Sequence, residues 1–139
     1  MVEGNILDLI PQRPPMVMID ELVFSHTHTA RCLFRVCNGN VFVTGKQFSE
    51  AGMIESMAQT AAAWKGFAGH LGIKDPTIGY IGAVNHLVVI SLPQVGDLIT
   101  IDIEVINQIF DAVVLRGRVS DPKGQLLSQC EMVIFIGKK

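Results

Sequence analysis

A carboxylate and an amide stand in an otherwise apolar stretch near the middle of the chain. Residues 48–64 read Phe-Ser-Glu-Ala-Gly-Met-Ile-Glu-Ser-Met-Ala-Gln-Thr-Ala-Ala-Ala-Trp, and a helix that is apolar on nearly every face is a buried helix. Glu55 and Gln59 lie one turn apart on the same face of that helix. Because burying a carboxylate is costly, it needs a partner or a function. Beside a cleft, a carboxylate transfers protons, activates water or attacks a carbonyl carbon.

Two interpretations of each residue stay open at this point. Glu55 is either a site residue or a structural residue near the positive end of the helix, paired with an arginine or a backbone donor. Gln59 is either a site residue or one side of a hydrogen bond between the helix and a sheet. The identity of whatever contacts Glu55 decides between these interpretations.

Four histidines are the other candidate proton carriers. His26 and His28 fall in a polar loop, where we expect solvated side chains, and their spacing suits a metal only with further ligands. His70 lies near the expected helix end, where a positive charge is favourable. His86 is the best candidate for a general base, and an ordinary strand histidine is its alternative. We therefore expect no metal and no cofactor.

Composition favours one apolar domain that associates with another chain. The 139 residues are 49% hydrophobic and 17% charged, the length of a single domain spanning 1–139. So apolar a chain predicts a large apolar interface, hence a homodimer or larger assembly. A net charge of −2 without a basic run argues against a nucleic-acid partner.

The cysteines and the apolar segments indicate a cytoplasmic protein. Cys32, Cys37 and Cys130 are an odd set without a CxxC pair, as expected of free thiols in a reducing compartment. The N-terminus lacks the basic and apolar regions of a signal peptide. The longest apolar segment, residues 77–92, is too short and too polar for a membrane span.

The elements that position Glu55 follow from hydrophobic periodicity. The helix is expected to begin near Ser49, a good N-cap, and to end at about Ala68. A short helix is expected over residues 5–10, before Pro11. Strands are expected at residues 16–25, 29–37, 78–90, 98–106, 112–119 and 126–136, with residues 41–48 pairing onward. Tight turns between neighbours predict an α+β fold, an antiparallel sheet wrapped around one long central helix.

Three segments resemble the 3-hydroxyacyl-[acyl carrier protein] dehydratase family, which has the hot-dog fold. The first is the lead-in segment, Ile10–Asp20, with its Pro-Gln-Arg-Pro-Pro run. The second is the helix motif Ile54-Glu-Ser-Met-Ala-Gln59. The third is a strand and a turn, Gly79–His86 and Pro93–Asp97. Together they span nearly the whole chain in the family's order.

The resemblance implies a site between two subunits that removes water from a 3-hydroxyacyl thioester on acyl carrier protein or CoA. A histidine takes the α-proton, and a helix carboxylate from the other subunit handles the departing hydroxyl. Glu55 matches the carboxylate. Gln12 stands where the family has its histidine, and an amide is no general base near pH 7.

Further binding residues are also implied by the resemblance. Backbone N–H groups at the helix start, around Ser49 and Gly52, would bind the thioester carbonyl. Ser49-Glu50 replaces the family's Pro-Gly there, and Glu50 would put negative charge where an oxyanion forms. Gln59 would contact substrate, and Arg13 would contact acyl carrier protein or a phosphopantetheine phosphate; a surface ion pair is the alternative for Arg13.

The replacement of the histidine leaves three functions open. The chain is a dehydratase of fatty-acid or polyene-lipid synthesis with Glu55 and Gln12 as its catalytic residues, a hot-dog acyl thioesterase, or a catalytically weak partner subunit of an active dehydratase. If the chain pairs with a homologue that keeps the histidine, a composite site would combine that histidine with Glu55. Such a heterodimer is a hypothesis motivated by Gln12 beside a retained Glu55.

Overall fold

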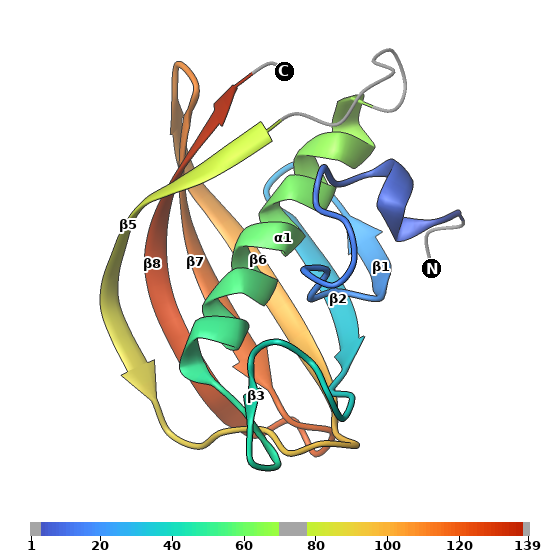
Figure 1. Ribbon diagram of the computed structural model, residues 1–139. Coiled ribbons are helices and arrows are strands. Elements are labelled where there is room, and N and C mark those ends of the chain that lie inside the picture. Colours follow the sequence, from blue (N-terminus) through green and yellow to red (C-terminus); the bar gives the residue numbers. More distant parts are fainter. Residues whose placement is uncertain (1–3, 70–77, 138–139) are drawn as a thin grey trace.

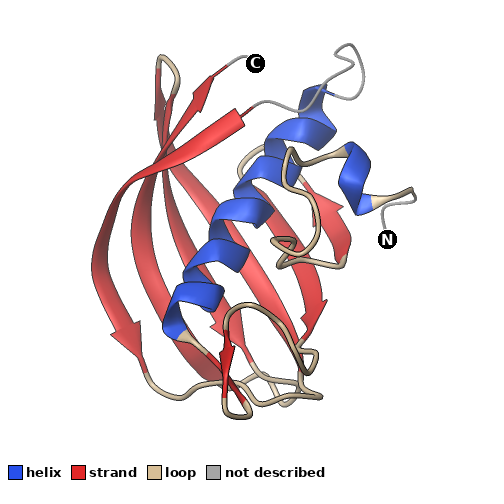
Figure 2. Ribbon diagram, viewed as in Figure 1, coloured by secondary structure: helices blue, strands red, loops and turns tan. Residues whose placement is uncertain are grey.

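A six-stranded antiparallel sheet curves around one long helix, α1 (Glu50–Gly69), which lies across the concave face (Figure 1). The structure is a computed structural model that describes residues 4–69 and 78–137. The sheet order is β1-β2-β6-β7-β8-β5, and Figure 2 shows the helix lying over this sheet. The strands are β1 (Glu21–Ser25), β2 (Thr29–Arg35), β5 (Ile78–Val89), β6 (Leu98–Ile109), β7 (Ala112–Ser120) and β8 (Leu126–Gly137). This confirms the predicted antiparallel sheet wrapped around a central helix.

The central helix begins and ends within one residue of the prediction. Ser49 precedes its first residue, and the Ser49 hydroxyl accepts a hydrogen bond from the Gly52 N–H at 3.2 Å. Met53, Met57 and Ala61 are fully buried. The helix is apolar on most faces because the sheet covers one side of it and the N-terminal residues pack on another (Figure 1).

The N-terminal elements are shorter than predicted. The expected helix over residues 5–10 is one 3-10 turn, η1 (Ile6–Asp8), capped by the Asn5 side chain, which accepts from the Leu7 N–H. The expected strand over residues 16–25 begins only at Glu21. Met18 and Ile19 are fully buried, so their apolar character reflected burial rather than strand pairing.

The segment between β2 and α1 forms a separate small hairpin. Its strands are β3 (Val43–Thr44) and β4 (Gln47–Phe48), which pair with each other and not with the large sheet. Phe48 is fully buried beneath the start of α1 and packs against Phe34. The hairpin therefore fixes where the helix begins.

The later strands alternate as the sequence predicts. The residues of β6 that face the helix are buried, namely Ile99, Ile101, Ile103 and Val105. The opposite face carries ion pairs, including Arg31 with Asp102 at 2.6 Å. Gly82 lies at a register shift between β5 and β8, an irregularity of the kind that bends a strand.

Gly66 allows the N-terminal segment to cross the helix at close range. A Cβ at Gly66 would overlap the carbonyl oxygen of Leu9 and lie 2.9 Å from its carbonyl carbon.

We expect Gly66→Ala to lower the free energy of unfolding by about 1–3 kcal/mol, the usual range for overpacking. In a helix without such a contact the same change stabilises by roughly 0.5–1 kcal/mol. Urea unfolding measures the sign, with Lys65→Ala on the exposed face as control; a more stable Gly66→Ala protein would contradict the close approach.

Candidate active site

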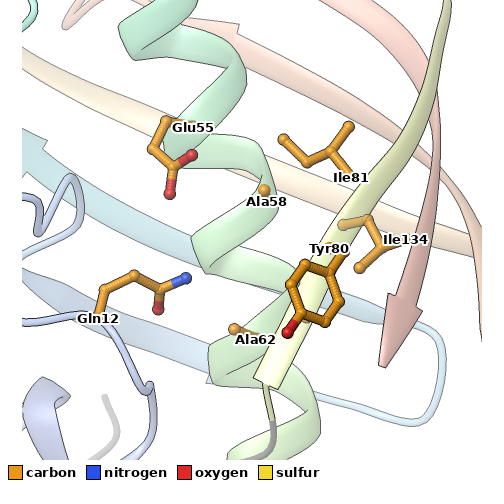
Figure 3. A pocket seen from close by; sticks show the side chains of 8 residues that line it. Gln12, Glu55, Ala58, Ala62, Tyr80, Ile81 and Ile134 are labelled. Carbon is orange, nitrogen blue, oxygen red and sulfur yellow. The ribbon is translucent and has the colours of Figure 1, made fainter. Parts of the chain in front are cut away.

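A cavity of about 230 Å³ lies between α1, β5 and the lead-in segment (Figure 3). Its lining residues are Gln12, Glu55, Ala58, Ala62, Gly79, Tyr80, Ile81 and Ile134. The two alanines lie on the same stripe of the helix as Glu55, and their small side chains leave room beside it. The cavity is thus mainly apolar, with the Glu55 carboxyl, the Gln12 amide and Tyr80 as its polar groups.

Glu55 is half-buried and its carboxyl has one protein partner among the described residues. The Gln59 Nε2 donates to the Glu55 Oε2 at 2.7 Å. Burial raises the pKa of the Glu55 carboxyl above its ordinary value, and the bond from Gln59 opposes this rise. The predicted alternative, an ion pair with arginine, is absent from the described part of the chain.

The raised pKa of Glu55 predicts how stability changes with pH. A carboxyl whose pKa is higher in the folded state stabilises the fold fully below its unfolded-state pKa, and this contribution is lost as pH rises through the folded-state pKa. Glu55→Gln removes the titration while keeping the side-chain shape. We therefore expect the stability of Glu55→Gln relative to wild type to increase as pH rises above the ordinary pKa of a glutamate, through the raised folded-state pKa of Glu55. Denaturant unfolding at several pH values measures it, and a difference independent of pH would contradict the assignment.

Gln59 lies behind the cavity rather than in its lining. The side chain is fully buried, and its Oε1 accepts from the Met18 N–H at 2.6 Å. Its Nε2 donates to the Met16 carbonyl at 2.7 Å as well as to Glu55. The predicted helix–sheet hydrogen bond is in fact a bond between the helix and the lead-in segment, and the amide has no free N–H for a substrate.

Gln12 faces the same cavity as Glu55 within one chain (Figure 3). The resemblance implied that the two positions belong to different subunits, whereas here one chain supplies both. The Gln12 Oε1 is buried and has no hydrogen-bond partner among the described residues. A buried acceptor without a partner is unfavourable, so this oxygen is suited to accept from a bound hydroxyl or water.

The other predicted binding residues lie away from the cavity. The exposed Arg13 guanidinium donates to the carbonyl oxygens of Ile10 at 2.8 Å and Gln12 at 2.7 Å, and so holds the lead-in backbone. Ser49 and Gly52 lie at the helix start, outside the lining. The Gly52 N–H is already engaged by the Ser49 hydroxyl. The described geometry thus brings together Gln12 and Glu55, with Gln59 behind them.

The chain matches one known protein family over nearly its whole length. Residues 4–138 match the ApeP-like family, described as ApeP dehydratase. The chain belongs to the ApeP-like family. Its match covers the lead-in segment, the central helix and the whole sheet, so the cavity lies within the shared region.

Solved structures show the same fold at low sequence identity. The Dehydratase Heterocomplex ApeI:P from Xenorhabdus doucetiae superposes with a TM-score of 0.90 at 16% identity, covering 99% of this chain and 94% of that chain. A hypothetical thioesterase with coenzyme A from Streptococcus pneumoniae has a TM-score of 0.68 at 12% identity, covering 86% and 89%. The hot-dog fold of this ApeP-like chain is thus also the fold of a protein described as a hypothetical thioesterase. A search of curated protein sequences finds no match.

No histidine lines the cavity in the described part of this ApeP-like chain. His26 and His28 are exposed, and His26 stacks on Phe24. His86, the predicted substitute base, is exposed at an irregularity of β5 with a φ of 55°. His70 lies outside the described residues.

Cysteine chemistry and a metal centre find no support in the described residues. Burial raises the pKa of the Cys32 thiol to about 12 and that of Cys130 to about 11, so neither is a thiolate at neutral pH. No group of three metal-ligating side chains occurs in residues 4–69 and 78–137. Within the same ranges no helix is long and apolar enough to cross a membrane.

Proposed function

We propose that this chain is a dehydratase subunit for 3-hydroxyacyl thioesters, with Glu55 as its proton-transfer residue. The supporting observation is a carboxyl of raised pKa in an apolar cavity, opposite a Gln12 oxygen that has no partner among the described residues. In the reaction a base removes the C2 proton, and the C–H electron pair forms the C2–C3 double bond. The C3–O bond breaks, and the leaving hydroxide takes a proton from Glu55 and departs as water.

Dehydration needs a base as well as this acid, and the amide of Gln12 is unsuited to that role. We infer that a histidine of a second hot-dog subunit, packed beside this cavity, supplies the base. Support comes from the similar structure described as a dehydratase heterocomplex. Gln12 would then accept a hydrogen bond from the substrate hydroxyl or from a water beside it.

The surface that would receive this subunit is the free edge of β5. β5 pairs only with β8 among the described strands. Apolar side chains are exposed along it and just beyond, at Tyr80, Ile81, Leu87, Val88, Val89 and Ile90. A long, apolar, uncharged edge strand is a template for pairing with another strand. Gly79, Tyr80 and Ile81 also line the cavity, so a subunit on this edge would lie beside the site.

We expect charges on this edge to prevent association. Val88 and Ile90 are 46% and 61% exposed, so their replacement by lysine leaves the core intact while disfavouring a second strand. We predict that the double variant Val88→Lys/Ile90→Lys no longer assembles with a second subunit. In analytical ultracentrifugation its mass should be that of the monomer, whereas the wild-type chain should show the mass of the assembly. Ile106→Lys is the matched control, since Ile106 is 47% exposed on β6 inside the sheet. An unchanged mass for the double variant, or equal loss in the control, would exclude the β5 edge.

The substrate we propose is an acyl chain on acyl carrier protein or CoA, in fatty-acid or polyene-lipid synthesis in the cytoplasm. The apolar lining beside Glu55 suits the acyl portion. A related hot-dog structure contains coenzyme A, whose thiol is the group that forms acyl thioesters. A reducing compartment fits the three free cysteines.

Product analysis tests the proposal. The chain is purified alone and together with a histidine-bearing hot-dog homologue, and each preparation receives a 3-hydroxyacyl thioester on acyl carrier protein or on CoA. Mass spectrometry is expected to show the 2,3-unsaturated thioester with the pair only. Release of free thiol would instead identify a thioesterase. Binding of the carrier without either product, in the pair as in the single chain, would identify a non-catalytic subunit.

A further inference from the structure

The hydrogen bonds of Gln59 leave its side-chain amide only one orientation. The Met18 N–H can only donate, so the amide oxygen must face it at 2.6 Å. The Met16 carbonyl can only accept, so the amide nitrogen must face it at 2.7 Å. Two backbone groups therefore determine which end of the amide is oxygen, an assignment that is otherwise ambiguous.

That orientation directs the second N–H of Gln59 to Glu55. The Nε2 carries two hydrogens, one bound by the Met16 carbonyl and the other by the Glu55 Oε2 at 2.7 Å. Because Gln59 is fully buried, no water competes for this donor. Glu55 Oε2 is thus always an acceptor, whether the carboxyl is ionised or protonated.

The other carboxyl oxygen, Oε1, is the one left free to contact a molecule in the cavity. Glu55 lines the cavity (Figure 3), and its Oε1 has no hydrogen-bond partner within the described residues. In a neutral carboxylic acid the carbonyl oxygen is the better acceptor, so the oxygen bound by the Gln59 N–H is the carbonyl and the proton is on Oε1. We propose that Gln59 is a positioning residue that confines proton exchange at Glu55 to Oε1, the oxygen left free to contact a molecule bound in the cavity.

This inference rests on the proposed function, since it names the atom of Glu55 that gives its proton to the departing hydroxide. The Oε1–H bond breaks as the new bond to hydroxide oxygen forms, and Oε2 gains negative charge that the Gln59 N–H stabilises. The same amide holds the lead-in segment that carries Gln12. One side chain thereby sets both the direction of the proton and the distance to the opposite wall.

The effect of Gln59 on the titration of Glu55 can be separated from the effects of other groups. Among the described lining residues Tyr80 is the only other titratable group, and no lysine, arginine or histidine lines the cavity. Ser56 provides a matched control, because its buried hydroxyl donates to the Met18 carbonyl at 2.8 Å and not to the Glu55 carboxyl. Gln59→Met and Ser56→Ala both loosen the lead-in segment, but only the first removes the donor to Glu55.

Carboxyl carbon NMR of glutamate-labelled protein tests the inference without turnover. Glu55 is assigned by the signal missing from Glu55→Gln. We expect Gln59→Met to raise the titration midpoint of Glu55 by on the order of one pH unit, and Ser56→Ala to leave it in place. An unchanged midpoint in Gln59→Met, or an equal shift in Ser56→Ala, would overturn the positioning role.

A second measurement on the wild type holds even if Gln59→Met fails to fold. One side-chain amide proton of Gln59 is expected to move downfield with the same midpoint as the Glu55 carboxyl carbon, because its bond strengthens when the acceptor ionises. If the chemical shifts of both Gln59 side-chain amide protons stay constant while Glu55 titrates, the inference is wrong. Neither experiment depends on turnover of a substrate. If the chain proves not to be a dehydratase, both titrations still show whether Gln59 controls the protonation of Glu55.

Discussion

Glu55→Gln should lower the rate of dehydration by the assembled pair about 100- to 10,000-fold, the range that general acid–base catalysis supplies. The amide keeps the shape of the side chain but has no proton to give to the departing hydroxide. Because the substituted group is half-buried and forms no ion pair with described residues, the fold should be kept. Single-turnover formation of the 2,3-unsaturated thioester measures the loss.

The matched comparison is the Glu50→Gln protein, which changes an exposed carboxylate on the first turn of the same helix. Its rate should stay within about twofold of wild type, since an exposed charge surrounded by water interacts weakly with a site that it does not line. Substrate binding by Glu55→Gln should also persist, because the apolar lining is unchanged. Near-normal dehydration by Glu55→Gln would remove this carboxyl from the mechanism.

Gln12→His should produce dehydration by this chain without its partner. The Gln12 and Glu55 side chains face one cavity of a single chain, so an imidazole at position 12 would place a base and an acid beside the same acyl group. Acid–base catalysis by a positioned histidine contributes on the order of 100-fold or more, so activity should rise at least tenfold over the unmodified chain. Initial rates with purified single chains measure this.

Two control variants test whether the gain in activity comes from a base at position 12 acting with Glu55. Gln12→Asn keeps an amide and should remain inactive, which separates the base from the altered shape. Gln12→His combined with Glu55→Gln should lose the gain, since elimination then lacks its acid. If Gln12→His stays inactive while the pair turns over substrate, the partner's base must approach from a direction other than position 12.

The sequence was sufficient to predict the fold because its signals were local. The alternation of Ile99, Ile101 and Ile103 with Thr100 and Asp102 specified a half-buried strand, and the all-round apolar pattern specified a buried helix. The error over residues 16–20 has a physical cause. Burial gives the same apolar pattern whether a segment bonds to a strand or to a glutamine side chain, and periodicity alone cannot distinguish the two.

The site was predictable in part. Glu55 and Gln12 were identified by type and by resemblance, and the structure places them at one cavity. The contacts of Gln59 with Met16 and Met18 join residues more than 40 positions apart, and no spacing rule reaches so far. Ser49 and Gly52 were expected to bind a carbonyl, but the capping bond between them depends on hydroxyl geometry that a sequence does not specify.

The wall of the cavity that carries Gln12 belongs to no sheet. Residues 16–18 are attached to the helix through the side chains of Ser56 and Gln59, while the strands close around the opposite side. The free energy of local opening rises with the buried apolar contacts that a segment makes, and Ile10, Met18 and Ile19 of this segment are fully buried. The wall is therefore held to the helix by side chains alone, through core packing and these hydrogen bonds, and its opening would break both. The Met18 N–H exchanges with solvent only when its hydrogen bond to Gln59 opens. Its hydrogen-exchange rate therefore measures how often this wall separates from the helix.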